Sequence, residues 1–576
     1  MISAFSAARG PRAAASRTVA TRERESVNRF SESRISRRTL LSALGAGAAV
    51  TAAGPLLSAC SSGGGGSTPG GSVTDEDSLG ALLPSYSPIE YAAPDLPGVL
   101  GSVPGYTSYP AELIRAVAEP PGTGGEVTAM TPAYWPLAPS DNAYYRAVNE
   151  RLGADVSFSV VNGSDYAARL NAQLAGGQLP ELTVIPDWDV PARFGEAVGS
   201  SFTDLTEYLQ GDAAHAYPHL ANLPTRAWAY CVWNEGLRAV PTPAGLFPLA
   251  LYHRRDLFEQ AGLAPPRSAD DLYRLCTEIT DPDAGRWACG NIFLEVKRMF
   301  NVPAEWSRDS AGNLVNEAET ESFAEAVAFM ARLFEEGHVH PTVAGSTTGQ
   351  EKELFESGAM WMLSDGMGAW QEALARQLPS NPTFDMRPFP AFSHDGGEPV
   401  YYTQEAANLM TFLRSDLPRE RVEELLRILD FCAAPIGSEE NHLINYGVDG
   451  EHSERDAAGA PSLTDLGSRE ITVTYGFLAK PPYIVDQSQY PGYVEAMHAW
   501  EAEVAPFQVD KLTDGLRIEE PPRLTGLAQQ LDDRIQDLLR GRTSVSELPS
   551  VLDGWRRDGG DELREFYAAA LDEAGR

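Results

Sequence analysis

The sequence predicts an α/β fold built from more than one domain, and three observations predict it. The chain has 576 residues, whereas a single hydrophobic core rarely grows beyond about 250–300 residues. Residues 126–185 alternate between strand and helix patterns, which is typical of a parallel sheet. A second stretch with a similar alternation begins near residue 249.

The first stretch reads as strand, helix, strand, helix, strand. We expect strands over 126–130, 154–161 and 179–185, where apolar residues run or alternate as they do in sheets. We expect helices over 141–152 and 166–174. Asp141 is the predicted N-cap of the first helix, and Gly153 and the pair Gly176-Gly177 are the predicted helix ends.

The second stretch opens with a strand over 249–252 and a short helix over 255–261 that Gly262 ends. Ser268 to Asp271 then caps a helix that runs through Cys276. Residues 319–336 form a strongly periodic helix, in which Phe323, Val327, Met330 and Phe334 fall on one face. This apolar stripe predicts packing against a core.

The first sixty residues read as a targeting segment. Arg37-Arg38 precedes an uncharged run, 40–59, that ends in Leu57-Ser58-Ala59-Cys60. The paired arginines resemble a twin-arginine export signal, and the last four residues resemble a lipobox in which Cys60 is acylated. The Gly/Ser-rich residues 61–72 then predict a flexible tether, and 73–125 an arm laid over the body. A transmembrane anchor is the alternative interpretation of the uncharged run.

Charge and cysteine usage restrict the function further. The formal net charge of -35 argues against nucleic acid as a partner, because phosphate binding needs clustered Lys and Arg. Cys276 and Cys289 could form a disulfide outside the cell, and buried free thiols are the equal alternative for them and for Cys231 and Cys432. His338 and His340 suggest either a metal site or surface histidines at a helix end, and the second is the prediction. No cofactor is expected.

Several motifs occur in a recognisable order. They are Leu179-Pro180-Glu181-Leu182, the segment from Tyr252 to Leu263, 302–306 with 309–314, 355–361 with 366–370, 446–452 and the closing helix 555–571. The ordered set resembles the family 1 extracellular solute-binding proteins, in their long lipoprotein branch, over residues 126–576. Glu181 stands where the family has Asp, and Asp449 and Glu451 also depart from its pattern.

The resemblance implies a two-lobe periplasmic-binding-protein-like α/β fold with discontinuous lobes and a cleft between them. We expect a signal over 1–60, a tether and arm over 61–125, the first lobe over 126–245 and 401–445, and the second lobe over 246–400 and 446–576. The chain should cross between lobes near 240–248, 390–403 and 440–470. The implied function is capture of a mono- or oligosaccharide for an ABC permease by a monomer, lipid-anchored on the extracytoplasmic face of the membrane, without catalysis.

A sugar pocket needs flat aromatic platforms together with side chains that form hydrogen bonds to hydroxyl groups. Aromatic residues near acidic or amide side chains in loops after predicted strands are therefore the candidates, since open α/β sheets bind ligands there. The predicted ligand-binding residues are Trp135, Asp141, Asn142, Asp187, Trp188, Trp233, Trp306, Trp370 and Tyr401. Trp188 is flanked by Asp187 and Asp189.

Two other classes compete with this interpretation. A lipoprotein that binds peptides or another small solute would pair with backbone and anchor a carboxylate instead of stacking sugar rings. A secreted glycoside hydrolase would need two carboxylates across a cleft, and carboxylates are so abundant here that their presence carries no weight. Neither a GxSxG elbow, an HExxH pair nor a P-loop occurs.

Overall fold

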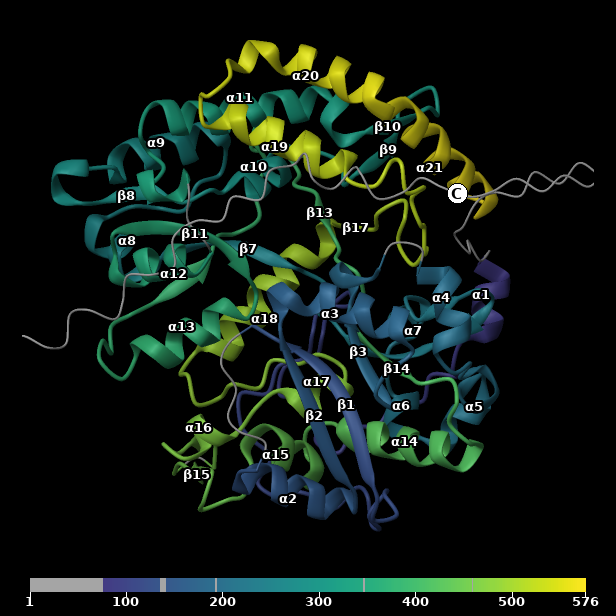
Figure 1. Cartoon of the computed structure of the whole chain (residues 1–576). Coiled ribbons are helices and arrows are strands. Elements are labelled where there is room, and N and C mark those ends of the chain that lie inside the picture. The colour runs from purple at the N-terminus through teal and green to yellow at the C-terminus, as the bar shows by residue number, and fades with distance from the viewer. Residues whose placement is uncertain (1–75, 135–140, 192–193, 345–347, 458) are drawn as a thin grey trace, which may run out of the picture. The chain divides into compact units, whose positions relative to one another are not determined.

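A computed structural model describes residues 76–134, 141–191, 194–344, 348–457 and 459–576. The described residues belong to one compact unit, and Figure 1 shows its helices and strands. The predicted α/β fold is confirmed, with two separate mixed sheets. Within the described residues, every helix is too short or too polar to cross a lipid bilayer.

The first sheet has five strands in the order β2 (Asp155–Asn162), β1 (Glu126–Ala133), β3 (Leu182–Pro186), β14 (Ala407–Leu413) and β6 (Ala239–Pro243). The first three strands are parallel, with Val127 opposite Val156 and Ala129 opposite Leu182. β14 is antiparallel to both of its neighbours. Every residue of β3 is buried, as expected for a strand covered on both faces.

Helices surround the first sheet, and their side chains join its core. The N-cap of α2 (Ala143–Leu152) lies one residue later than predicted, because the side chain of Asn142, not that of Asp141, accepts the hydrogen bond from the Tyr145 N–H. Gly153 ends this helix in the left-handed conformation, as predicted. The other helices on this side are α3 (Gly163–Gly176), α4 (Phe194–Ser201), α5 (Thr206–Leu209), α6 (Pro218–Ala221), α7 (Thr225–Ala229), α14 (Arg419–Cys432), α15 (Glu439–Tyr446), α16 (Gly467–Glu470) and α17 (Thr474–Leu478).

The second sheet has four strands in the order β12 (Met386–Pro388), β7 (Leu249–Arg254), β11 (Met360–Gly366) and β8 (Trp287–Cys289). Only the pair β11 and β8 is parallel. Ser268 caps α9 as predicted, since its hydroxyl accepts from the Asp271 N–H. The apolar face of the long helix is buried at Phe323, Val327 and Met330.

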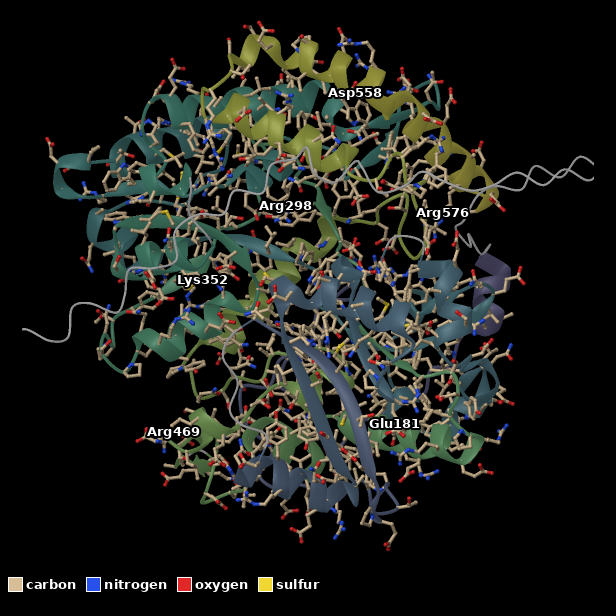
Figure 2. The ribbon with its side chains drawn as sticks, viewed as in Figure 1. Glu181, Arg298, Lys352, Arg469, Asp558 and Arg576 are labelled. Carbon is tan, nitrogen blue, oxygen red and sulfur yellow. The ribbon has the colours of Figure 1, made fainter. Side chains whose placement is uncertain are left out.

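The helices that accompany the second sheet are α8 (Arg255–Ala261), α9 (Ala269–Ile279), α10 (Phe293–Met299), α11 (Glu321–Glu335), α12 (Thr348–Ser357), α13 (Ala369–Gln377) and α18 (Tyr493–Val504). The chain closes with α19 (Leu527–Leu539), α20 (Leu548–Trp555) and α21 (Asp561–Glu573), drawn in yellow in Figure 1. α19 packs on α11, and α21 packs on β10 (Leu314–Asn316), which forms a hairpin with β9 (Trp306–Arg308). Figure 2 places Arg298 of α10 and Lys352 of α12 among the side chains of this part, and Glu181 beside the first sheet.

Short strand pairs and an arm complete the fold. β13 (Tyr401–Tyr402) pairs with β17 (Gln508–Val509), β4 (Val232–Trp233) with β5 (Gly236–Leu237), and β15 (Ser453–Arg455) with β16 (Pro461–Leu463). After α1 (Glu76–Leu82), the residues up to 125 run along the body through isolated bridges, such as that between Gly105 and Val485. Tyr106 and Tyr109 of this arm are buried.

Between Pro243 and Val485 the chain passes between the two cores three times. It leaves the first sheet after Pro243 and joins a core of the second sheet at Phe247. It returns between β13 and β14, and passes over again between Ala479 and Val485. The third passage lies later than the expected 440–470, because Tyr475, Leu478 and Ala479 pack into the first core. These residues were expected in the second lobe but pack in the core of the first sheet.

The structure decides the state of the cysteines and corrects the expected position of two histidines. Cys231, Cys276, Cys289 and Cys432 are all buried free thiols, so the disulfide alternative is not formed. His338 and His340 are buried instead of lying on the surface. Their ring nitrogens contact Thr280 and Thr342, respectively.

Candidate functional site

An exposed aromatic pair lies where strands β1 and β3 end. Tyr134 follows β1, and Trp188 lies in a 3₁₀ turn, Asp187–Asp189, that follows β3. Parallel strands end at the same edge of a sheet, so the two rings come together, with centroids 6.2 Å apart and planes inclined by 52°. Trp188 is 61% exposed and Tyr134 is 47% exposed, an unusual amount of aromatic surface to leave in water.

Gly163 allows the ring of Tyr134 to lie close to the start of α3. A Cβ at this position would lie 2.2 Å from Tyr134 Cε1, so any other residue would displace the ring. The sequence therefore supplies both the ring and the small residue that lets it approach the helix.

Asp189 places a carboxylate beside the aromatic pair. Its Oδ2 atom is buried and has no hydrogen-bond partner among the described residues, and burial raises the pKa of the group. A buried acceptor without a partner is costly, and it can accept a hydrogen bond from a hydroxyl-bearing ligand. Aromatic faces beside such an acceptor form the chemistry that sugar recognition needs.

Arg517 connects the same strand end to the C-terminal part of the chain. Its Nη1 donates to Asp187 Oδ1 at 2.6 Å, and its Nε donates to the Tyr230 carbonyl at 2.8 Å. The guanidinium also lies 4.6 Å from the ring centroid of Trp233. Arginine suits this position because its planar fork can bond at the edge and stack on its face. The carboxylate of Asp187 is therefore already bonded to Arg517.

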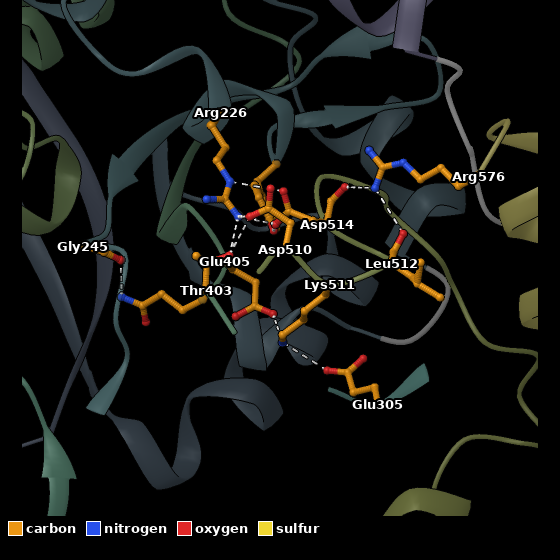
Figure 3. A network of polar contacts seen from close by, with 12 residues as sticks. Arg226, Gly245, Glu305, Thr403, Glu405, Asp510, Lys511, Leu512, Asp514 and Arg576 are labelled. Atoms are coloured by element: carbon orange, nitrogen blue, oxygen red, sulfur yellow. Dashed lines mark hydrogen bonds and ion pairs between the residues drawn. The ribbon is translucent and has the colours of Figure 1, made fainter. Parts of the chain in front are cut away.

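A second polar network lies where the chain passes between the sheets (Figure 3). Arg226 donates to Asp514, Asp510 and Thr403. Lys511 donates to Glu405 at 2.7 Å and to Glu305 at 3.2 Å. Burial opposes the charge on Lys511, but Glu305 and Glu405 outweigh it and raise the pKa of Lys511 to about 12. Its charge is therefore fixed at physiological pH.

A cavity of about 310 Å³ opens beside this network, and we call it the crossing cavity. Its volume lies at the lower end of the range of about 300–1,000 Å³ found for small-molecule sites. Its charged lining consists of Lys297, Arg298, Lys511, Glu305, Glu317 and Glu405. Lys297 Nζ donates to Glu317 Oε1 at 2.8 Å. Because the lining holds three cations and three carboxylates, it offers both hydrogen-bond donors and hydrogen-bond acceptors.

The structure brings together few of the aromatic residues predicted as ligand-binding. Trp188 is exposed at the strand edge beside Asp187, and Trp306 lies against Tyr567 of α21. Trp233 is 2% exposed among Phe194 and Phe412, and Trp370 is 1% exposed beside Tyr252 and Tyr493. Tyr401 is 8% exposed, with Arg298 over its ring. Trp233, Trp370 and Tyr401 are enclosed by other side chains, whereas Trp306, although only 5% exposed, lines a cavity among the C-terminal helices.

The remaining predicted positions lie elsewhere. Asp141 is exposed just before α2, and Asn142 caps that helix. Trp135, Arg37, Arg38 and Cys60 lie outside the described residues. Sequence reasoning missed Lys297, Glu305, Glu405 and Lys511, which come from separate segments and share no motif. In the part of the chain that the structure describes, His, Cys, Asp and Glu side chains form no group that could hold a metal ion.

Comparisons with known proteins agree on one class. The sequence model described as "Bacterial extracellular solute-binding protein" matches residues 108–413, more than half of the chain. Lipoprotein LipO of Bacillus subtilis (strain 168) is 22% identical over 474 residues, which cover 77% of this chain and 91% of LipO. The polygalacturonan/rhamnogalacturonan-binding protein YtcQ of the same organism is 20% identical over 476 residues, covering 79% of this chain and 93% of YtcQ.

A solved structure shares the fold. The crystal structure of the alginate-binding protein AlgQ2 without calcium ion has a TM-score of 0.58 and 13% sequence identity. The match covers 80% of this chain and 100% of the AlgQ2 chain.

Proposed function

Because the chain belongs to the bacterial extracellular solute-binding proteins, we propose that its solute is a carbohydrate, which it delivers to an ABC permease. The observation that carries the proposal is the exposed pair of Tyr134 and Trp188 beside the unpartnered Oδ2 of Asp189. Sugar rings present weakly polar C–H faces and hydroxyl edges. Aromatic faces and carboxylate acceptors complement these two features.

The names of relatives support a carbohydrate over a peptide. YtcQ is named for binding polygalacturonan and rhamnogalacturonan, and AlgQ2 for binding alginate. The crossing cavity adds support, because its paired charges offer fixed donors and acceptors for hydroxyl groups.

We further propose that the chain is exported and anchored by a lipid on Cys60, as a monomer on the extracytoplasmic face of the membrane. The motif around Arg37, Arg38 and Cys60 supports this, as does the lipoprotein relative LipO. A Gly/Ser-rich tether after Cys60 would let the body reach a permease.

In the proposed mechanism, the ligand is held between the two sheets and favours a closed arrangement. The three chain passages are the places where backbone rotation changes the relation of the two sheets. At the second passage, Glu405 bonds to Lys511 and Thr403 bonds to Arg226 (Figure 3). A ligand that contacts this network and the strand edge shifts the open–closed equilibrium by its differential affinity for the two states.

Isothermal titration of the purified protein against neutral and acidic oligosaccharides, peptides and amino acids tests the proposal. We expect one saccharide class to bind, and Trp188→Ala to weaken that binding at least about tenfold without changing the melting temperature of the free protein. Tyr86→Ala is the matched control, since Tyr86 is an aromatic residue of the arm with a similar exposure, 54% against 61% for Trp188. Binding of peptides alone would refute the carbohydrate class, and turnover of a glycoside would refute a pure binding role.

A further inference from the structure

A second cavity lies beside the crossing cavity, among the C-terminal helices. It has a volume of about 400 Å³, and we call it the helical cavity. Its walls come from α10, the β9–β10 hairpin, α11 and helices α19 to α21, which Figure 1 shows packed together at one side of the second sheet. Of the residues predicted from the sequence to bind ligand, only Trp306 lines this cavity.

The wall between the two cavities is thin and polar. Leu294, Lys297, Glu305 and Glu317 line both of them. Lys297 Nζ contacts both carboxylate oxygens of Glu317, at 2.8 and 3.0 Å, and the Glu317 N–H donates to the Glu305 carbonyl at 2.7 Å. A ligand in the crossing cavity that is longer than this cavity therefore meets the Lys297–Glu317 pair and the helical cavity beyond it.

The helical cavity combines aromatic rings with carboxylates. The rings of Trp306 and Tyr567 pack against each other in a tilted arrangement, with centroids 5.1 Å apart and planes inclined by 32°, and Trp555 contributes a third ring to the lining. Glu520 Oε1 accepts from the Tyr567 hydroxyl at 3.1 Å, which leaves its other oxygen available as an acceptor. This mixture of ring surface and hydrogen-bond acceptors is the one that sugar recognition requires.

The charges of the helical cavity select against anionic ligands. Its lining holds the carboxylates of Glu305, Glu317, Glu520 and Asp532, and one cation, Lys297, which is already paired with Glu317. A ligand carboxylate here would face like charges at short range, which is costly when water is partly excluded. The polymers for which YtcQ and AlgQ2 are named are rich in anionic sugars, so this cavity calls for a different ligand from theirs.

We propose that the helical cavity is a second subsite, so that the ligand is an uncharged oligosaccharide that extends from the crossing cavity past the Lys297–Glu317 pair into the C-terminal helices. This inference rests on the proposed carbohydrate function. It specifies two further properties of the ligand, namely its length and the absence of charge on its distal sugar units.

A blocking substitution tests the subsite. Ala528 is exposed on α19 and lines the helical cavity, whereas Gln530 is exposed on the same helix and does not line it. Ala528→Trp should fill the cavity with a ring, while Gln530→Trp places the same ring elsewhere on the surface. Neither position is buried, so both variants should fold, and circular dichroism with thermal melting checks this.

The titration uses malto-, cello-, manno- and xylo-oligosaccharides of two and five units, with di- and pentagalacturonides as the anionic series. We expect a neutral pentasaccharide to bind the unmodified protein at least about tenfold more tightly than its disaccharide. Ala528→Trp should reduce this ratio to about one, Gln530→Trp should leave it unchanged, and the galacturonides should gain nothing with length. A length gain that survives in Ala528→Trp, or one confined to galacturonides, overturns the inference.

The same data separate the two proposals. If Trp188→Ala abolishes saccharide binding but Ala528→Trp leaves the length ratio intact, the carbohydrate function stands and only the second subsite fails. If no saccharide of either length binds the unmodified protein, the carbohydrate function fails and the subsite fails with it.

Discussion

The buried carboxyl of Glu501 makes the stability of this protein depend on pH in a direction opposite to that of an ion-paired acid. Glu501 lies in α18, is 2% exposed, and accepts a hydrogen bond at 2.9 Å from the Val103 N–H of the N-terminal arm. Burial raises its pKa from 4.5 to about 7, and the bond from Val103 opposes this rise only in part. The folded chain therefore keeps this proton to a higher pH than the unfolded chain does.

The magnitude follows from linkage. Between pH 4.5 and 7 the native state binds more protons than the unfolded state, so the free energy of unfolding falls as pH rises. At about 1.36 kcal/mol for each pKa unit, the difference between 4.5 and about 7 corresponds to a loss of about 3 kcal/mol by pH 8. Glu501→Gln keeps an acceptor for the Val103 N–H and carries no charge. It should therefore be more stable than the unmodified protein by about 3 kcal/mol at pH 8 and nearly equal to it at pH 5.

Urea unfolding at pH 5 and pH 8, followed by tryptophan fluorescence, measures both differences. Glu503→Gln is the control, since Glu503 lies two residues away on the same helix and is exposed. Equal destabilisation by Glu501→Gln at both pH values would refute the reasoning, because it would show that the carboxyl acts through packing and not through its ionisation.

Three further substitutions test other parts of the structure. Arg517→Met should lower the free energy of unfolding by about 1.5–3 kcal/mol, the range for hydrogen bonds to charged groups, because Asp187 and the Tyr230 carbonyl lose their donor. Gly467→Ala should cost about 1–3 kcal/mol, since its Cβ would lie 1.9 Å from the His452 carbonyl oxygen. Burial opposes ionisation of Glu319, but its arginine partners outweigh this and lower its pKa, so Glu319→Gln should destabilise at pH 7, and less so as pH falls towards 3.

Each of these has a control substitution, measured by the same unfolding assay. Arg523→Met removes an exposed ion pair and should change stability by less than about 1 kcal/mol. Gly476→Ala adds a Cβ that meets no atom within 4 Å in α17, and should be neutral or stabilising by up to about 1 kcal/mol. Glu321→Gln changes an exposed residue of α11. A control that costs as much as its partner would contradict the assigned contact.

Local sequence signals located the three parallel strands of the first sheet and strand β7 of the second sheet to within a few residues, but not the other strands. Errors arose where two residues could serve as a cap. The long helix was expected to begin at Glu319, but Glu319 completes a capping box with Asn316, and the next residue, Thr320, caps α11. Asn142 took the place of Asp141 for the same reason. Asp141, Asn142, Asn316 and Thr320 are all of residue types that cap helices well, so only the backbone geometry selects among them.

The site was harder to predict than the fold. Proximity to the end of a strand correctly placed Asp187 and Trp188 at the sheet edge, because the direction of parallel strands fixes which loops meet. The ion pair between Lys511 and Glu305 joins residues 206 positions apart. Neither segment contains a local sequence pattern that predicts this contact.

The sequence by itself determined the alternation of strands and helices, the family, and the strand edge at which Trp188 lies. These properties depend on neighbours along the chain, whose spacing can be counted. Only the tertiary structure decided that Trp233 and Trp370 are enclosed while Trp188 is open, and that the C-terminal helices form a second cavity beside the first. The physical reason is that the burial of an aromatic ring depends on which distant segments pack against it. The same indole ring can fill a hydrophobic core or offer a face to a ligand.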